Sequence, residues 1–145
     1  ISIEDLHEMT TQIYLPENYI NKNSFNLDYE QRAFIWEAMS ASPNKLGLSK
    51  EKYPENFVKF FVRGDEMEND SIKNNLNIYN KVGTAYGQIT ETAFIDSDTN
   101  KFILTATMYV NENDIINDDI YEYESVGIPF FASFAREILS NIKTE

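Results

Sequence analysis

Three strand-like runs between residues 76 and 110 constrain the fold of this chain more than any other feature. Residues 76–84 alternate between apolar and polar side chains, residues 88–96 form a second run, and residues 102–110 are rich in β-branched and aromatic side chains. These patterns are typical of β-strands. Residues 97–100, Ser-Asp-Thr-Asn, form a turn cluster. The short turn predicts that the second and third strands form an antiparallel hairpin.

Helices are predicted on both sides of the strand region. Ser2, followed by Glu4 and Asp5, begins a helix that Pro16 ends. A second capping signal is Asp28-x-x-Gln31, and its helix stops near residues 42–43. The last helix begins at Ile128-Pro129, where proline is tolerated. The apolar side chains at helical spacing are Leu6, Met9 and Ile13 in the first helix, Phe34, Ile35, Ala38 and Met39 in the second, and Phe130, Phe131, Phe134, Ile138 and Ile142 in the last.

The remaining segments are mostly polar. Residues 18–26, 43–56, 64–75 and 111–124 are interpreted as loops. Residues 57–62 form a short apolar run, for which both a strand and a helix are open. We therefore expect one α+β domain over residues 1–145, with N-terminal helices, a three-stranded antiparallel sheet and a C-terminal helix packed on it.

Composition excludes several classes of function. A hydrophobic fraction of 42% with 14% aromatic residues predicts a folded globule. The net charge of -12 disfavours nucleic acid or an anionic membrane as a partner. The lack of cysteine excludes disulfides, thiol catalysis and cysteine-ligated zinc. No apolar run approaches the roughly 20 residues of a membrane span.

Several motifs are weak candidates for a catalytic or metal site. His7, the one histidine, lies on a predicted helix, and no nucleophile elbow accompanies it. Ser-x-x-Lys pairs occur at Ser42/Lys45, Ser49/Lys52 and Ser140/Lys143, in broken or terminal segments where a lysine stays solvated and protonated. The acidic residues 111–119 lack the glycine and ligand spacing of an EF-hand loop. We interpret them as a solvated loop, and we expect no metal and no cofactor.

Lys81-Val82-Gly83 is the most informative motif. It ends the alternating run of residues 76–84 and leads into Thr84. A lysine at the end of a strand, followed by a small residue, is how penicillin-recognising serine enzymes present a cation to a substrate carboxylate.

The segments around this motif extend the similarity. They are residues 15–18 (Leu-Pro-Glu-Asn), 58–61 (Val-Lys-Phe-Phe), 78–87 (Ile-Tyr-Asn-Lys-Val-Gly-Thr-Ala-Tyr-Gly), 117–123 and 127–130. With these segments the chain resembles, from about Leu6 to Ile142, the C-terminal half of class A β-lactamase-like serine hydrolases, in particular a divergent group found in Bacteroidetes.

The resemblance implies an acyl-enzyme mechanism, in which a serine attacks a β-lactam or a related amide and water releases the product. Lys81 is similar in position to the lysine that contacts the substrate carboxylate. Gly83 would let the substrate approach the backbone, and the Thr84 N–H would be one donor of the oxyanion hole. The resemblance further implies a penicillin-binding or antibiotic-resistance context, export to the periplasm or cell surface, and a β-lactam or cell-wall peptide as ligand.

Two departures from the family pattern lower the expected activity. Val82 stands where a Thr or Ser hydroxyl would contact the substrate carboxylate, and losing that hydrogen bond would weaken recognition roughly 10–150-fold. The nucleophile Ser-x-x-Lys motif, the Ser-Asp-Asn motif and the deacylating Glu would lie upstream of the matched region. We therefore expect a fragment of a hydrolase that is inactive alone. The alternative is a non-catalytic domain of the same fold that binds cell-wall peptide or protein.

The strand at residues 102–110 predicts that copies of the chain bind one another. In the resembled family the sheet has further strands from the N-terminal half, so this strand would have an open, apolar edge here. We expect self-association through that edge.

Overall fold

The computed structural model describes residues 1–18, 25–65 and 76–142. It is an α+β structure with an antiparallel sheet of β1 (Leu76–Ala85), β2 (Gln88–Ser97) and β3 (Lys101–Tyr109), in that order. The strands and the hairpin predicted from the sequence are confirmed. Between β1 and β2, Tyr86 and Gly87 both have positive φ, as in a type I′ turn, whose twist matches that of paired strands.

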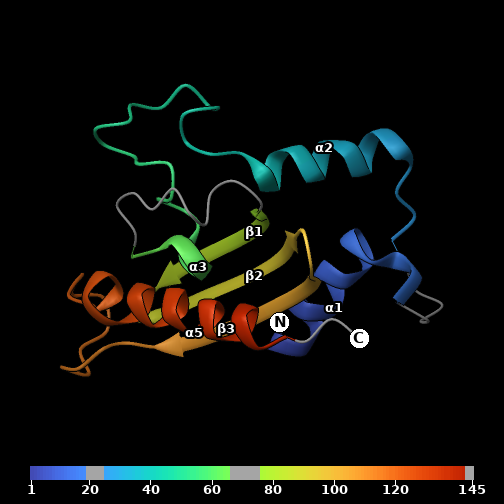
Figure 1. Cartoon of the computed structure of the whole chain (residues 1–145). Coiled ribbons are helices and arrows are strands. Elements are labelled where there is room, and N and C mark those ends of the chain that lie inside the picture. Colours follow the sequence, from blue (N-terminus) through green and yellow to red (C-terminus); the bar gives the residue numbers. More distant parts are fainter. Residues whose placement is uncertain (19–24, 66–75, 143–145) are drawn as a thin grey trace.

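Helices cover both faces of the sheet. α1 (Ile3–Tyr14) and α2 (Tyr29–Ser40) pack on one face, and α3 (Phe60–Arg63) and α5 (Ile128–Asn141) on the other (Figure 1). A short 3-10 turn, η1 (Pro16–Asn18), follows α1, and a π-helical turn, η2 (Tyr123–Gly127), leads into α5. Both predicted helix caps are confirmed: Ser2 accepts from the N–H of Asp5 and Asp28 from that of Gln31, and each is part of a capping box.

The two faces bury different side chains. Towards α3 and α5 the core is mainly aliphatic, and Phe61, Ile89, Ile95 and Phe131 are almost fully buried in it. The other face carries an aromatic cluster of Tyr14, Trp36, Tyr79 and Phe94. In this cluster Tyr14 stacks on Phe94 with ring centroids 5.0 Å apart.

The packed side of the helices differs from the apolar pattern of the sequence. In α1 the buried residues are Thr10, Gln12 and Tyr14. In α5, Phe130 is 52% exposed and Phe134 is 40% exposed. The prediction that both lie on the packed side of this helix is therefore wrong. The buried residues of α5 are Phe131, Ala132 and Ala135. Small alanines let a helix backbone approach its neighbours closely, and this turns the two bulky rings outwards.

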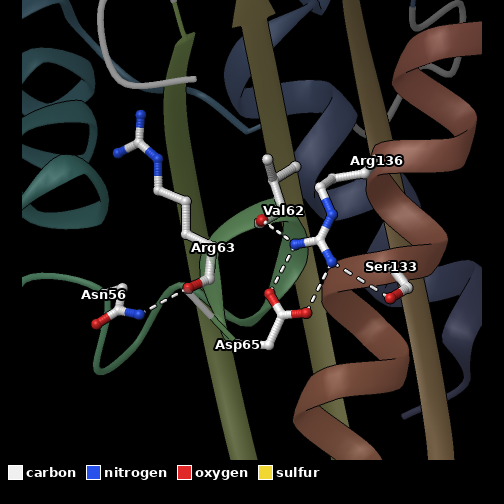
Figure 2. A network of polar contacts seen from close by, with 6 residues as sticks. All are labelled: Asn56, Val62, Arg63, Asp65, Ser133 and Arg136. Atoms are coloured by element: carbon white, nitrogen blue, oxygen red, sulfur yellow. Dashed lines mark hydrogen bonds and ion pairs between the residues drawn. The ribbon is translucent and has the colours of Figure 1, made fainter. Parts of the chain in front are cut away.

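Residues 57–62, whose structure the sequence left open, run into the short helix α3, whose backbone is irregular at Phe61 and Val62. Val62 has φ 69° and ψ -42° and is fully buried. A positive φ in a β-branched residue is strained, at a cost of order 1–3 kcal/mol. Arg136 of α5 holds this turn, because its guanidinium donates to the Val62 carbonyl at 2.8 Å and to both carboxylate oxygens of Asp65 at 2.6 and 2.7 Å (Figure 2).

Candidate binding edge on strand β1

The four predicted site residues lie together in the second half of β1. Lys81, Gly83 and Thr84 are exposed, and Val82 packs partly against the core. Because side chains alternate along a strand, Lys81 lies on the same face as Tyr79, towards α1 and α2. Val82 and Thr84 lie on the opposite face. The Val82 side chain is therefore not beside the Lys81 ammonium group.

The backbone of Val82 and Thr84 faces the free edge of β1. The carbonyls of Leu76, Ile78 and Val82 accept hydrogen bonds from arginine or lysine side chains at 2.8, 3.0 and 2.9 Å, so they point away from β2. In an antiparallel ladder the N–H and C=O groups of every second residue point the same way. Thr84 belongs to this series, and its N–H and C=O therefore lie on the same free edge.

Space is available beside this edge. A Cβ atom placed on Gly83 would meet no atom within 4 Å. The Lys81 ammonium group donates to the carbonyl of the next residue at 2.9 Å and has no carboxylate partner in the described part of the chain. Because the lysine stem is flexible and exposed, this weak local contact can be exchanged for a ligand carboxylate.

A shallow pocket of about 420 Å³ lies where the edge ends. The phenol of Tyr123 accepts from the N–H of Gly87 at 2.7 Å, and that of Tyr121 accepts from the N–H of Asn117 at 2.7 Å, so the walls are held by hydrogen bonds. The pocket is lined by Thr84, Ala85, Tyr86, Asn117, Asp119, Tyr121 and Tyr123.

A buried polar network lies beneath the edge. Lys59, Asn80 and Glu91 are 5%, 7% and 0% exposed. The Lys59 ammonium group donates to the Met39 carbonyl at 2.8 Å, to the Ile78 carbonyl at 3.0 Å and to Oδ1 of Asn80. Three acceptors for three N–H groups satisfy this lysine completely.

Asn80 passes the network on to Glu91. Its Nδ2 donates to the Val58 carbonyl at 2.7 Å and to Oε1 of Glu91, while Oε2 of Glu91 accepts from the N–H of Phe61 at 2.6 Å. Burial raises the pKa of Glu91 to about 8, although its hydrogen bonds and the charge of Lys59 oppose the shift. Burial also lowers the pKa of Lys59 to about 8.

The structure does not bring the other sequence motifs together. Nδ1 of His7 lies 3.1 Å from Oγ1 of Thr105, on the face of the sheet covered by α1. No serine hydroxyl is hydrogen-bonded to a lysine in residues 1–18, 25–65 and 76–142. Ser140 instead donates to the carbonyl of Glu137 at 2.9 Å, and Lys143 is outside the described residues.

Neither a metal site nor a membrane helix is found in the described segments. Within them, no group of three or more His, Asp or Glu side chains is arranged to hold a metal ion. No helix there has the length and apolar character needed to cross a membrane. In the acidic loop, Asp118 accepts from the N–H of Ile120 and from Asn113, which lowers the pKa of this carboxyl group.

Comparisons with models of protein families, with curated proteins and with solved structures found no match.

The buried network of Lys59, Asn80 and Glu91 was not predicted from the sequence. A lysine inside the apolar run of residues 57–62 and a glutamate inside a predicted strand were the available signals.

Proposed function

We propose that this chain is part of a β-lactamase-like serine hydrolase and that the β1 edge from Lys81 to Thr84 binds a carboxylate-bearing amide or β-lactam. The nucleophile serine lies outside these residues, so the chain alone is inactive. In the complete enzyme the serine forms an acyl-enzyme with the substrate, and water then releases the product.

One observation carries the proposal. An exposed, flexible cation stands three residues before a backbone N–H that lies on an open strand edge, and the residue between them on the cation's face is a glycine with free space. This arrangement offers a charge for a carboxylate and a donor for a developing oxyanion in the same extended stretch. The resemblance of residues 78–87 to the family supports the same assignment.

Val82 is expected to lower the affinity for the ligand. Its side chain packs against the core and supplies no hydroxyl to the ligand. Lys81 is therefore the main carboxylate contact, and Thr84, in the exposed last part of β1, offers its backbone N–H. Weak recognition of β-lactams is the expected consequence.

Intact-mass spectrometry after incubation with a reactive penicillin tests the proposal. The 145-residue chain and a polypeptide extended at its N-terminus are compared. A mass increase only in the extended polypeptide supports a nucleophile outside these residues. An increase in the 145-residue chain contradicts that part of the proposal, because one of its own serines would then be the nucleophile. No increase in either contradicts acyl-enzyme formation.

A second candidate is a domain that binds cell-wall peptide or protein without turnover. It is favoured by the absence of a serine–lysine hydrogen bond in the described residues and by the missing hydroxyl at Val82. Under this proposal the edge binds a peptide carboxylate, Lys81→Ala weakens binding, and no variant or extension is acylated.

We further propose that the parent protein is exported and that copies of this chain associate through β3. In the described part of the chain β3 pairs only with β2, so it presents an edge. Light scattering at increasing concentration tests this association, and a monodisperse monomer would contradict it.

A further inference from the structure

We infer that Lys59, Asn80 and Glu91 are positioning residues, which fix the free edge of β1 from beneath and thereby place Lys81 and Thr84 for ligand binding. The inference deepens the proposed function and rests on it. None of the three touches the ligand. They act through the backbone of the strand that does.

The network is attached to β1 next to the binding residues. Asn80 directly precedes Lys81, and Glu91 is the cross-strand partner of Val82 in the β1–β2 register. Both side chains point to the core face, where they are buried. Any shift of Asn80 therefore also moves Lys81 and the free-edge backbone groups of Val82 and Thr84, which follow it in the same strand.

Asn80 is held at both ends of its amide. Its Oδ1 accepts from Lys59, and its Nδ2 donates to Glu91 and to the Val58 carbonyl. Each direction of donation is determined, because the Lys59 ammonium group only donates and the Val58 carbonyl only accepts. The amide therefore has one orientation, and the strand has one position relative to the segment that precedes α3.

The network also joins β1 to elements that are far away in sequence. Lys59 reaches the carbonyl of Met39 at the end of α2, and Glu91 accepts from the N–H of Phe61, next to the strained turn at Val62. Buried hydrogen bonds of this kind are costly to break, because each group left without a partner keeps its full desolvation penalty. This makes the edge a rigid platform.

A charge-conserving swap tests the inference. Glu91→Gln alone puts an amide NH₂ against either the Phe61 N–H or the Asn80 amide, so it breaks one link. In the double variant Asn80→Asp/Glu91→Gln, the glutamine still accepts from Phe61 and now donates to Asp, which accepts from Lys59. The formal net charge is unchanged, and the bond to the Val58 carbonyl is replaced by a contact between two acceptor oxygens.

Two readouts are measured for each variant. The first is the backbone amide NMR spectrum of the ligand-free chain, at Lys81, Gly83 and Thr84. The second is the affinity for an unreactive, ring-opened penicillin, which retains the carboxylate. Glu55→Gln is the matched control, because Glu55 is exposed and, among the described residues, pairs only with Asn44.

Glu91→Gln is expected to displace the three amide signals and to weaken binding roughly tenfold, which is the effect of replacing residues that hold the ligands of a metal site in place. The double variant is expected to restore the signals and to bring affinity within about threefold of wild type, and Glu55→Gln to change neither. Unchanged signals in Glu91→Gln, or signals in a folded double variant that lie no nearer to wild type than those of Glu91→Gln, would overturn the inference.

The outcome is separable from that of the proposed function. If the wild-type chain binds no ring-opened penicillin, the proposed binding edge fails, and the amide spectra still decide whether the network positions the strand. If Glu91→Gln does not fold, the double variant decides alone, since a native spectrum at residues 81–84 supports the inference and a displaced one refutes it.

Discussion

Raising the pH from about 5 to 8 should weaken the fold, and Glu91 should be responsible. Its pKa is raised from the ordinary 4.5 to about 8 by complete burial. The native state therefore keeps a proton that the unfolded state releases. The stability that this group contributes is fully present below pH 4.5 and is lost as the pH rises towards 8.

The size of the effect follows from the two pKa values. One proton held by the native state alone changes the free energy of unfolding by about 1.4 kcal/mol per pH unit. From pH 4.5 to about 8 the loss is at most roughly 5 kcal/mol. This is a large part of the 5–15 kcal/mol that stabilises a typical domain.

Lys59 should reverse the trend at higher pH. Its pKa is lowered from 10.5 to about 8, so the native state releases a proton that the unfolded chain keeps. Stability from this group is present above 10.5 and is lost as the pH falls to about 8. The network therefore predicts a minimum of stability near pH 8.

Urea unfolding followed by the fluorescence of Trp36 measures this curve, because the indole lies against Tyr14 and Tyr79. Wild type and Glu91→Gln are compared between pH 5 and 8, with Glu55→Gln as the control. The decrease in the free energy of unfolding between pH 5 and 8 should disappear in Glu91→Gln and remain in Glu55→Gln. A wild-type stability that is flat or rises over this range, relative to Glu91→Gln, would refute the reasoning.

Three further predictions concern the edge and the core. Lys81→Ala should weaken binding of a carboxylate ligand roughly 10–150-fold without changing stability, as judged by calorimetric titration beside the control Lys50→Ala; equal affinities would remove Lys81 from the site. Gly87→Ala should lower the free energy of unfolding by about 1–3 kcal/mol, because φ at this position is +84° and the new Cβ would lie 2.8 Å from the Cβ of Asn111. Gly83→Ala should leave the melting temperature nearly unchanged, because its new Cβ would meet no atom within 4 Å, but it should lower the affinity for the carboxylate ligand. Phe131→Ala should cost about 3–5 kcal/mol in urea unfolding and the 52% exposed Phe130→Ala less than about 1; similar losses would contradict the packing of α5.

Local signals predicted the elements well. Ser2 and Asp28 cap their helices as expected, since a cap depends on side chains only three residues apart. The alternation in residues 76–110 predicted the strands, and the turn at residues 97–100 predicted the hairpin. The four residues of the candidate edge also lie in the strand predicted for them, because they follow one another in the sequence.

The sequence alone determined where α1, α2, α5 and the three strands lie to within a few residues, because capping, alternation and turn chemistry act over that distance. Only the tertiary structure decided which side of α5 is packed, since the close approach of Ala132 and Ala135 outweighs the bulk of Phe130. It also decided that Lys59 and Glu91 meet through Asn80. A buried ionisable group is tolerated only when hydrogen-bond partners are supplied, and the partners of Lys59 and Glu91 are 11 to 30 residues away along the chain.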